Sequence, residues 1–149
     1  MTRAQPRTAA PDYSGTPLAR KLGIGEGARV VIRFAPREYT QWLRPLPAGV
    51  TFGKAVTPDT DVVHVFAARK AVLADELAAL RGTIRPDGVV WASWPKKAAN
   101  VPTDVTEQTI RDVALPLGFV DIKVCAVSDV WSGLKLVIRK NQRRVGAAG

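Results

Sequence analysis

Residues 28–37, ARVVIRFAPR, decide the fold of this chain. The run from Ala28 to Phe34 is mostly apolar, which is typical of a parallel strand that is covered on both faces. The turn after it, residues 35–38, contains proline and arginine but no glycine. Nucleotide-binding α/β domains place glycines at this turn, because backbone amides approach a phosphate there. The stretch therefore predicts an α/β sheet that lacks the usual cofactor loop.

Strand and helix patterns alternate along the rest of the chain. Short apolar runs predict further strands at 50–52, 61–66, 89–94, 119–127 and 134–139, and helical spacing predicts helices at 16–22, 36–43, 70–81 and 104–117. The last two strands are separated by only a few residues, which favours an antiparallel hairpin. The sequence therefore predicts a single Rossmann-like three-layer α/β sandwich, with a mostly parallel sheet of order 2-1-3-4-6-5 and an antiparallel last strand.

Length, hydropathy and cysteine content restrict the class of protein. The 149 residues suffice for one domain with one core. No stretch approaches the ~20 apolar residues that a membrane span needs, and the first residues lack the apolar segment of a secretion signal. The single cysteine, Cys125, has no partner for an intramolecular disulfide. We therefore expect a cytoplasmic protein that does not enter a membrane.

The formal net charge of +9 is concentrated at the two ends of the chain. Residues 1–21 carry +3 and residues 135–149 carry +5, whereas 13 basic and 12 acidic residues nearly cancel between 22 and 134. We expect a disordered lead over 1–11, a domain over 12–140 and a basic tail over 141–149. Such ends are typically solubilising, and the alternative is a contact with nucleic-acid phosphates.

The predicted order of elements resembles a class I methyltransferase domain that has lost one strand–helix unit. The acidic residue and glycines that follow the first strand of those enzymes are replaced here by Phe34-Ala35-Pro36-Arg37. The Asp/Asn-Pro-Pro-aromatic motif of the amino-group methyltransferases is replaced by Phe-Ala-Ala-Arg at 66–69. The resemblance therefore supports the fold, whereas the missing motifs disfavour methyl transfer.

Four segments carry a closer resemblance, which spans residues 12–139: DYSGTPLARKLG at 12–23, WPKK at 94–97, PTD at 102–104 and WSGLK at 131–135. Together they resemble a small bacterial family catalogued as domain of unknown function 3052. That family has no assigned activity, so the resemblance implies a shared fold and gives no residue a chemical role. It marks as motif residues Tyr13, Ser14, Gly15, Trp94, Pro95, Thr103, Asp104, Gly133 and Lys135.

Basic residues follow three of the predicted parallel strands. Because ligands of open parallel sheets bind beyond the carboxyl ends of the strands, these residues are predicted to form a rim for a phosphate, a carboxylate or an acidic partner. The hairpin at the end of the sheet adds an aromatic side chain, which could stack on a ligand, and a hydroxyl group. The candidate ligand-binding residues are Arg37, Arg69, Lys70, Lys96, Lys97, Asp129, Trp131 and Ser132. The alternative is that these are ordinary solvated residues at strand ends.

His64, Cys125 and Ser132 are weaker candidates for catalytic chemistry. His64 lies on one face of a predicted central strand and is the only histidine, so we interpret it as a core imidazole. Cys125 is placed on the face of Asp121 and Lys123, with no base in view to activate it. Ser132 lacks the G-x-S-x-G context of a nucleophilic serine. No catalytic residue, metal ligand or cofactor is predicted.

Three classes of function remain open from the sequence. The first is a non-catalytic binding module for an anionic small molecule or an acidic protein. The second is a divergent methyltransferase-like enzyme, and the third is a nucleic-acid-associated protein that acts through its basic ends. A homodimer is a further option, because the predicted sheet has open edges.

Overall fold

A computed structural model describes residues 16–142 of the chain. The predicted lead over 1–11, the motif residues Tyr13, Ser14 and Gly15, and residues 143–149 of the predicted tail lie outside the described residues. The elements are α1 (Leu18–Lys21), β1 (Arg29–Arg33), α2 (Tyr39–Trp42), β2 (Thr51–Gly53), β3 (Val62–Phe66), α3 (Lys70–Thr83), β4 (Val89–Pro95), the 3-10 helix η1 (Lys97–Ala99), α4 (Glu107–Leu117), β5 (Phe119–Ala126) and β6 (Trp131–Ile138).

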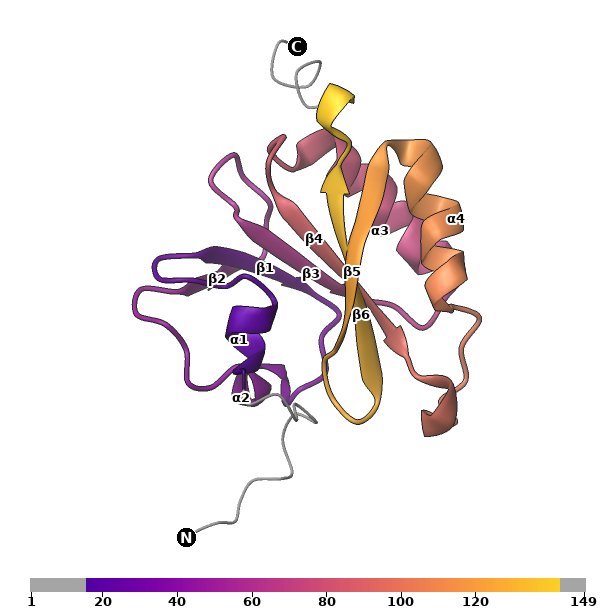
Figure 1. Cartoon of the computed structure of the whole chain (residues 1–149), viewed down its shortest axis with the longest axis horizontal. Coiled ribbons are helices and arrows are strands. Elements are labelled where there is room, and N and C mark those ends of the chain that lie inside the picture. The colour runs from indigo at the N-terminus through magenta and orange to yellow at the C-terminus, as the bar shows by residue number, and fades with distance from the viewer. Residues whose placement is uncertain (1–15, 143–149) are drawn as a thin grey trace, which may run out of the picture.

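The six strands form one sheet in the order β2-β1-β3-β4-β6-β5 (Figure 1). Neighbouring pairs from β2 to β4 are parallel, and β6 runs antiparallel to both β4 and β5. The predicted Rossmann-like α/β class, strand order and antiparallel last strand are confirmed. None of the helices within residues 16–142 is long and apolar enough to cross a membrane.

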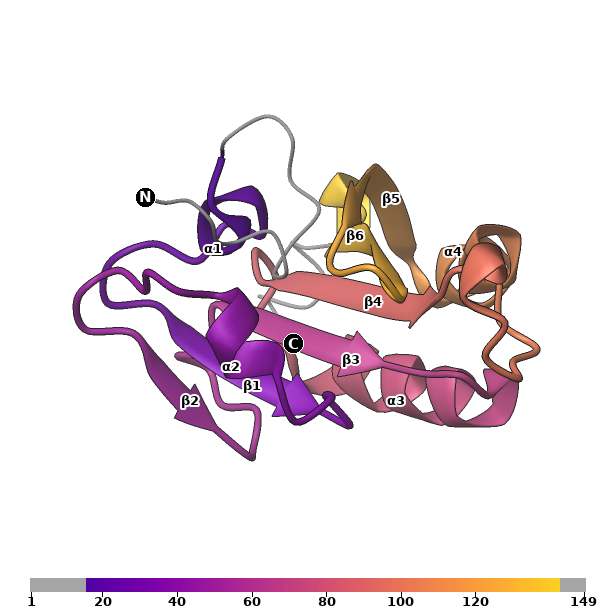
Figure 2. The ribbon, with the colours of Figure 1, turned by 90° about the horizontal axis from the view of Figure 1, so that it is seen from below.

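Alternate residues of the central strands face two separate cores, which explains the three layers (Figure 2). On one face Val31 and Val63 pack with α3 and α4, and on the other Val30 and Val62 pack with α1 and α2. All five residues of β3 are buried, as expected of a central parallel strand.

Helix α3 illustrates how the sequence pattern builds the first core. Leu73, Leu77 and Leu80 recur at helical spacing, so they lie on one stripe of the helix, and all three are buried. Burying each of them contributes about 2 kcal/mol of hydrophobic stabilisation. The predicted helix is confirmed and extends to Thr83.

The predicted start of α4 is wrong. The side chain of Thr106, rather than that of Asp104, accepts a hydrogen bond from the third residue of the helix, and Thr109 completes the capping box. Asp104 instead caps α3, since its Oδ1 accepts a hydrogen bond from the Lys70 amide at 2.6 Å. Sequence spacing alone could not reveal a cap that comes from a distant loop.

The predicted face of Cys125 is corrected by a β-bulge. The register of β5 against β6 shifts between Asp121, which pairs with Leu136, and Lys123, which pairs with Lys135. Asp121 and Lys123 therefore point to opposite faces, and Cys125 shares a face with Lys123 only. The Cys125 side chain is buried in the core formed with α1 and α2.

Candidate functional site: the carboxyl edge of the sheet

Strands β1, β3 and β4 end side by side at the carboxyl edge of the sheet. The chain leaves β1 toward β2 on one side, and β3 then lies on the other side of β1. The strand order therefore reverses between β1 and β3, and ligands of open α/β sheets bind in the crevice at such a point. The side chains near this point determine which ligands the chain can bind.

Aromatic side chains fill the space behind this crevice. Tyr39 of α2 is only 1% exposed, and its ring packs edge to face against the rings of His64 and Phe66 at centroid distances of 5.0 and 5.2 Å. The His64 and Phe66 rings stack at 4.3 Å. Helix α2 thus places a large side chain against the last part of β3, on the face of the sheet that α1 and α2 cover.

The same cluster contains a buried chain of hydrogen bonds. The Tyr39 hydroxyl lies 2.7 Å from His64 Nδ1, and His64 Nε2 lies 2.7 Å from Ser93 Oγ. Burial lowers the pKa of His64 to about 3 and raises the pKa of Tyr39, so both side chains are neutral at pH 7. The three residue types suit nucleophilic catalysis, but all three side chains are buried and closed to a substrate. The predicted core role of His64 is confirmed.

Phe34, the residue after β1, was not predicted as a site residue. Its φ is 62°, in the left-handed region that favours glycine, and its side chain is 61% exposed. The guanidinium of Arg33 lies 5.5 Å from the centre of the Phe34 ring. The sequence does hold a signal for this residue, since Phe34 begins the segment that replaces the glycine motif of methyltransferases.

The predicted cations lie at the ends of three neighbouring strands. Arg37, Arg69, Lys70 and Lys97 are exposed and Lys96 is half-buried. None of the ion pairs within residues 16–142 involves these five side chains. Whether these charges serve a ligand stays a prediction.

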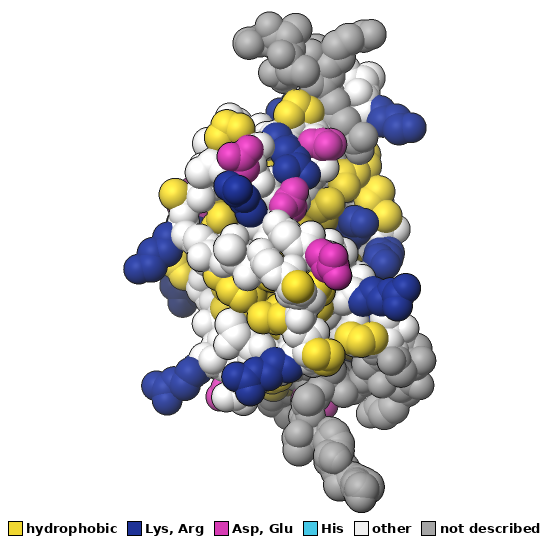
Figure 3. Space-filling model, turned by 90° about the vertical axis from the view of Figure 1, so that its left-hand side faces the viewer, with side chains coloured by type: hydrophobic (Ala, Val, Ile, Leu, Met, Phe, Trp, Pro, Cys, Tyr) yellow, Lys and Arg dark blue, Asp and Glu magenta, His cyan; other side chains and the backbone are white. Residues whose placement is uncertain are grey.

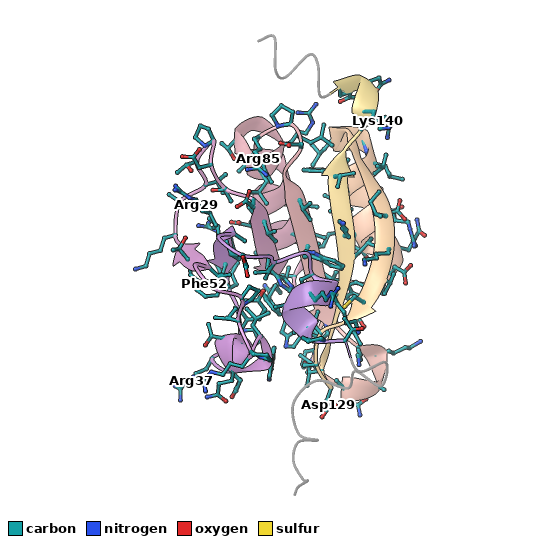
Figure 4. All side chains as sticks on the ribbon, turned by 60° about the vertical axis from the view of Figure 1, so that its left-hand side comes forward. Arg29, Arg37, Phe52, Arg85, Asp129 and Lys140 are labelled. Carbon is teal, nitrogen blue, oxygen red and sulfur yellow. The ribbon has the colours of Figure 1, made fainter. Side chains whose placement is uncertain are left out.

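The β5–β6 hairpin meets this edge as predicted. The amide of Lys96 donates a hydrogen bond to the carbonyl of Val130 at 2.6 Å, and Pro95 pairs with Trp131. Arg37 and Asp129 lie at one end of the molecule, and Arg85 and Lys140 lie at the other (Figure 4). The structure thus brings the hairpin and the strand exits to one edge, whereas their function as a ligand site stays a prediction.

Trp131 and Ser132 do not form a common binding surface. Trp131 is half-buried and packs edge to face against Phe66 at 5.1 Å, so part of its ring belongs to the core. Ser132 is the next residue along β6 and therefore points to the opposite face of the sheet. Of these two residues, only the exposed part of Trp131 adjoins the cluster of Tyr39 and Phe66.

Several motif residues have structural roles. A Cβ at Gly133 would lie 3.0 Å from Ser93 Oγ and 3.2 Å from the ring of Trp91, so a side chain here would need its buried neighbours to shift by a few tenths of an ångström. The Thr103 hydroxyl donates a hydrogen bond to the carbonyl of Ala68 at 2.7 Å, beside the Asp104 cap of α3. Lys135 of β6 lies opposite Trp91 of β4 in the antiparallel register. Trp94 and Pro95 are buried in the last part of β4. These contacts give the motif residues between 94 and 135 a place in the fold.

The described part of the chain offers no obvious metal site. Among residues 16–142, no group of three or more His, Cys, Asp or Glu side chains gathers closely enough to hold an ion. A hollow of about 620 Å³ lies between α1 and the 45–47 loop, lined in part by Arg20, Glu26 and Leu46. This hollow is separate from the predicted basic residues.

Comparison with known proteins identifies the fold. No family model and no curated protein matches the chain, so the resemblance to domain of unknown function 3052 stays a prediction. A SAM dependent methyltransferase from Aquifex aeolicus superposes with a TM-score of 0.60 at 10% identity, over 81% of this chain and 87% of that chain. A candidate type 11 methyltransferase from Sulfolobus solfataricus gives 0.58 at 12% identity, over 82% and 89%.

A third solved structure, of a candidate exported protein from Bordetella parapertussis, has a TM-score of 0.57 at 11% identity and covers 82% of this chain and 66% of that chain. At such low identity the likeness is evidence of the fold alone. The chain therefore has the Rossmann-like fold of class I methyltransferases.

Proposed function

We propose that this chain is a binding module built on the methyltransferase fold, which takes an anionic ligand at its carboxyl edge and does not use S-adenosylmethionine. The observation that carries the proposal is the burial of Tyr39, which packs against Phe66, the last residue of β3, next to the point where the strand order reverses. A cofactor site needs a crevice there, and this chain has a packed side chain.

The residues present do not fit S-adenosylmethionine. A ligand of that size occupies a pocket of about 300 Å³ or more. Opening such a space would require moving Tyr39, which would remove a hydrogen-bonding partner from the buried His64. The turn after β1 also offers fewer amide donors, because Pro36 has no N–H group.

The unpaired cations favour an anionic ligand. Five basic side chains follow β1, β3 and β4 without an ion pair to another described residue. Positive side chains on one edge raise the local concentration of anions and form charge-assisted hydrogen bonds with them. An exposed edge suits a ligand that lies across the surface better than one that must be enclosed.

Methyl transfer is the second candidate. Two of the similar solved structures are described as methyltransferases, and these comparisons favour a methyltransferase-like enzyme over a non-catalytic module. The filled crevice argues in the other direction. Cofactor binding therefore separates the two candidates.

Titration calorimetry with S-adenosylmethionine tests the choice. We expect no binding tighter than about millimolar, because the ligand would have to displace packed aromatic side chains. Micromolar binding would overturn the proposal and put methyl transfer first.

A parallel titration with inorganic pyrophosphate tests the anion site. The double variant Lys96→Ala/Lys97→Ala should weaken pyrophosphate binding about tenfold, whereas Lys140→Ala, at the opposite end of the molecule, should not. Equal loss in both variants would show that the charge acts without a defined site.

A further inference from the structure

Phe34 combines backbone strain with an exposed aromatic ring. A bulky residue at φ 62° is a genuine outlier, because its Cβ crowds the neighbouring carbonyl oxygen. Glycine would relieve this strain, and losing a side chain that is 61% exposed would remove little packing. Strained residues of this kind cluster at ligand sites. The phenyl ring of Phe34 is therefore better explained by contact with a ligand than by packing within the fold.

The Phe34 ring is supported by a fixed cation. Arg33 Nε and Nη2 donate hydrogen bonds to the two carboxylate oxygens of Glu76 at 2.9 and 3.1 Å. This bidentate contact orients the guanidinium that lies 5.5 Å from the ring centre. The ring thus has one oriented neighbour, and such a contact modestly favours its position.

The basic residues of the carboxyl edge follow β3 and β4, the strands that come after β1 in the sheet order. The Phe34 end of β1 adjoins β3, which leads to Arg69 and Lys70, and β4 follows with Lys96 and Lys97. Neighbouring strands lie about 4.8 Å apart, so the residues that follow three adjacent strand ends are an aromatic ring after β1 and pairs of cations after β3 and β4.

We infer that the carboxyl edge binds single-stranded nucleic acid, with a base stacked on Phe34 and phosphates held by the cations after β3 and β4. Every base offers a π-face to an aromatic ring, and the backbone supplies regularly spaced negative charge. An acidic protein would satisfy the cations but gives no reason for the strained, exposed ring. The inference rests on the proposed function, since it names the anion that this edge takes.

Phe52 provides a matched control for Phe34. It is 38% exposed on β2, the edge strand opposite β5, and it pairs with Val30 near the start of β1. Figure 3 shows the β2 side of the molecule, where Asp and Glu side chains are interspersed with Lys, Arg and hydrophobic groups. A ring on that mixed surface tests whether any exposed phenylalanine would serve.

Fluorescence anisotropy of the full chain with a labelled oligothymidylate of about 12 nucleotides tests the inference. Phe34→Gly should weaken binding about tenfold and raise the melting temperature by about 3 °C, because glycine relieves the strain at φ 62°. Phe52→Ala should bind like the wild type. The opposite signs of the stability and binding effects separate lost stacking from unfolding.

Variants of the cations and a truncation complete the test. Lys96→Ala/Lys97→Ala should weaken binding and lower the slope of log K against log salt by about 1 to 2. Wild-type affinity in Phe34→Gly, or binding that disappears on removal of residues 1–11 and 143–149, would overturn the inference.

The failures of the two proposals are distinguishable. If pyrophosphate binding depends on Lys96 and Lys97 while oligothymidylate binding does not depend on Phe34, the inference is wrong and the anion-binding module stands. If polyglutamate competes for the edge and Phe34→Gly leaves both ligands unaffected, the partner is an acidic protein and the inference is again wrong. If neither pyrophosphate nor oligothymidylate binds, both proposals fail.

Discussion

The carboxyl edge of the sheet and the core directly behind it both contain polar and aromatic side chains. Those of the core are buried and paired, and those of the edge are largely exposed. In the core, Tyr39, His64 and Ser93 satisfy one another through hydrogen bonds and are closed to solvent. At the edge, Lys96 and Lys97 have no ion pair to a described residue, and Phe34 is exposed. Tyr39, His64 and Ser93 therefore stabilise the fold, and a ligand role is proposed only for the exposed residues of the edge.

The contrast separates two parts of the fold, the packed core and the exposed edge. A parallel sheet brings the ends of its strands to one edge whatever side chains they carry. Helix α2 supplies Tyr39 to the core behind that edge. The predictions below test the two regions separately, from the largest effect on stability to the smallest.

The filled core should be sensitive to the loss of the Tyr39 ring. We expect Tyr39→Ala to lower the free energy of unfolding by about 4 kcal/mol, because it leaves a cavity and deprives His64 of a partner. Tyr39→Phe keeps the ring and should cost about 1–2 kcal/mol. Urea denaturation measures both, and a loss below about 1 kcal/mol in Tyr39→Ala would mean that the ring does not fill the crevice.

Acid should destabilise the chain through its single histidine. The folded pKa of His64, about 3, lies below its unfolded value of about 6.5, so the unfolded state binds more protons between these values. The contribution of His64 is therefore complete above pH 6.5 and decreases as the pH falls toward 3. At pH 5 we expect a loss of about 2 kcal/mol relative to neutral pH. Denaturation at both pH values should show this loss in the wild type.

His64→Gln is the control for the acid effect. It removes the titrating group, so the difference in unfolding free energy between pH 7 and pH 5 should shrink even if the variant is less stable overall. An unchanged difference would assign the acid effect to carboxylates.

The cap on α3 should have an intermediate effect. Asp104→Ala removes the acceptor of the Lys70 amide hydrogen bond and should lower the unfolding free energy by about 1 kcal/mol. Asp104→Asn retains an oxygen acceptor and should cost less. Asp129→Ala, an exposed residue of the hairpin, should change stability by less than about 0.5 kcal/mol. Equal effects of Asp104→Ala and Asp129→Ala would remove the structural explanation of this motif residue.

The sequence predicted the sheet better than the site, for a physical reason. The positions of β3 and β4 along the chain follow from apolar runs, and their place in the sheet follows from the alternation of strands and helices. The Asp104 cap and the Tyr39–His64 bond join residues 34 and 25 positions apart, and no local pattern encodes such pairs. Phe34 was not predicted as a site residue because a sequence suggests a positive φ mainly where the residue is glycine.

The edge itself should contribute least to stability, and that expectation separates a binding role from a structural one. Lys96 is held by its backbone amide, which donates to the Val130 carbonyl, and this bond survives replacement of the side chain. Lys96→Ala/Lys97→Ala should therefore change the unfolding free energy by no more than about 0.5 kcal/mol. Removing two neighbouring positive charges could even stabilise the chain slightly, because the cations of this edge repel one another. A loss of 2 kcal/mol or more in urea denaturation would show that these lysines hold the hairpin to β4, and the carboxyl edge would then have lost its best evidence for a ligand.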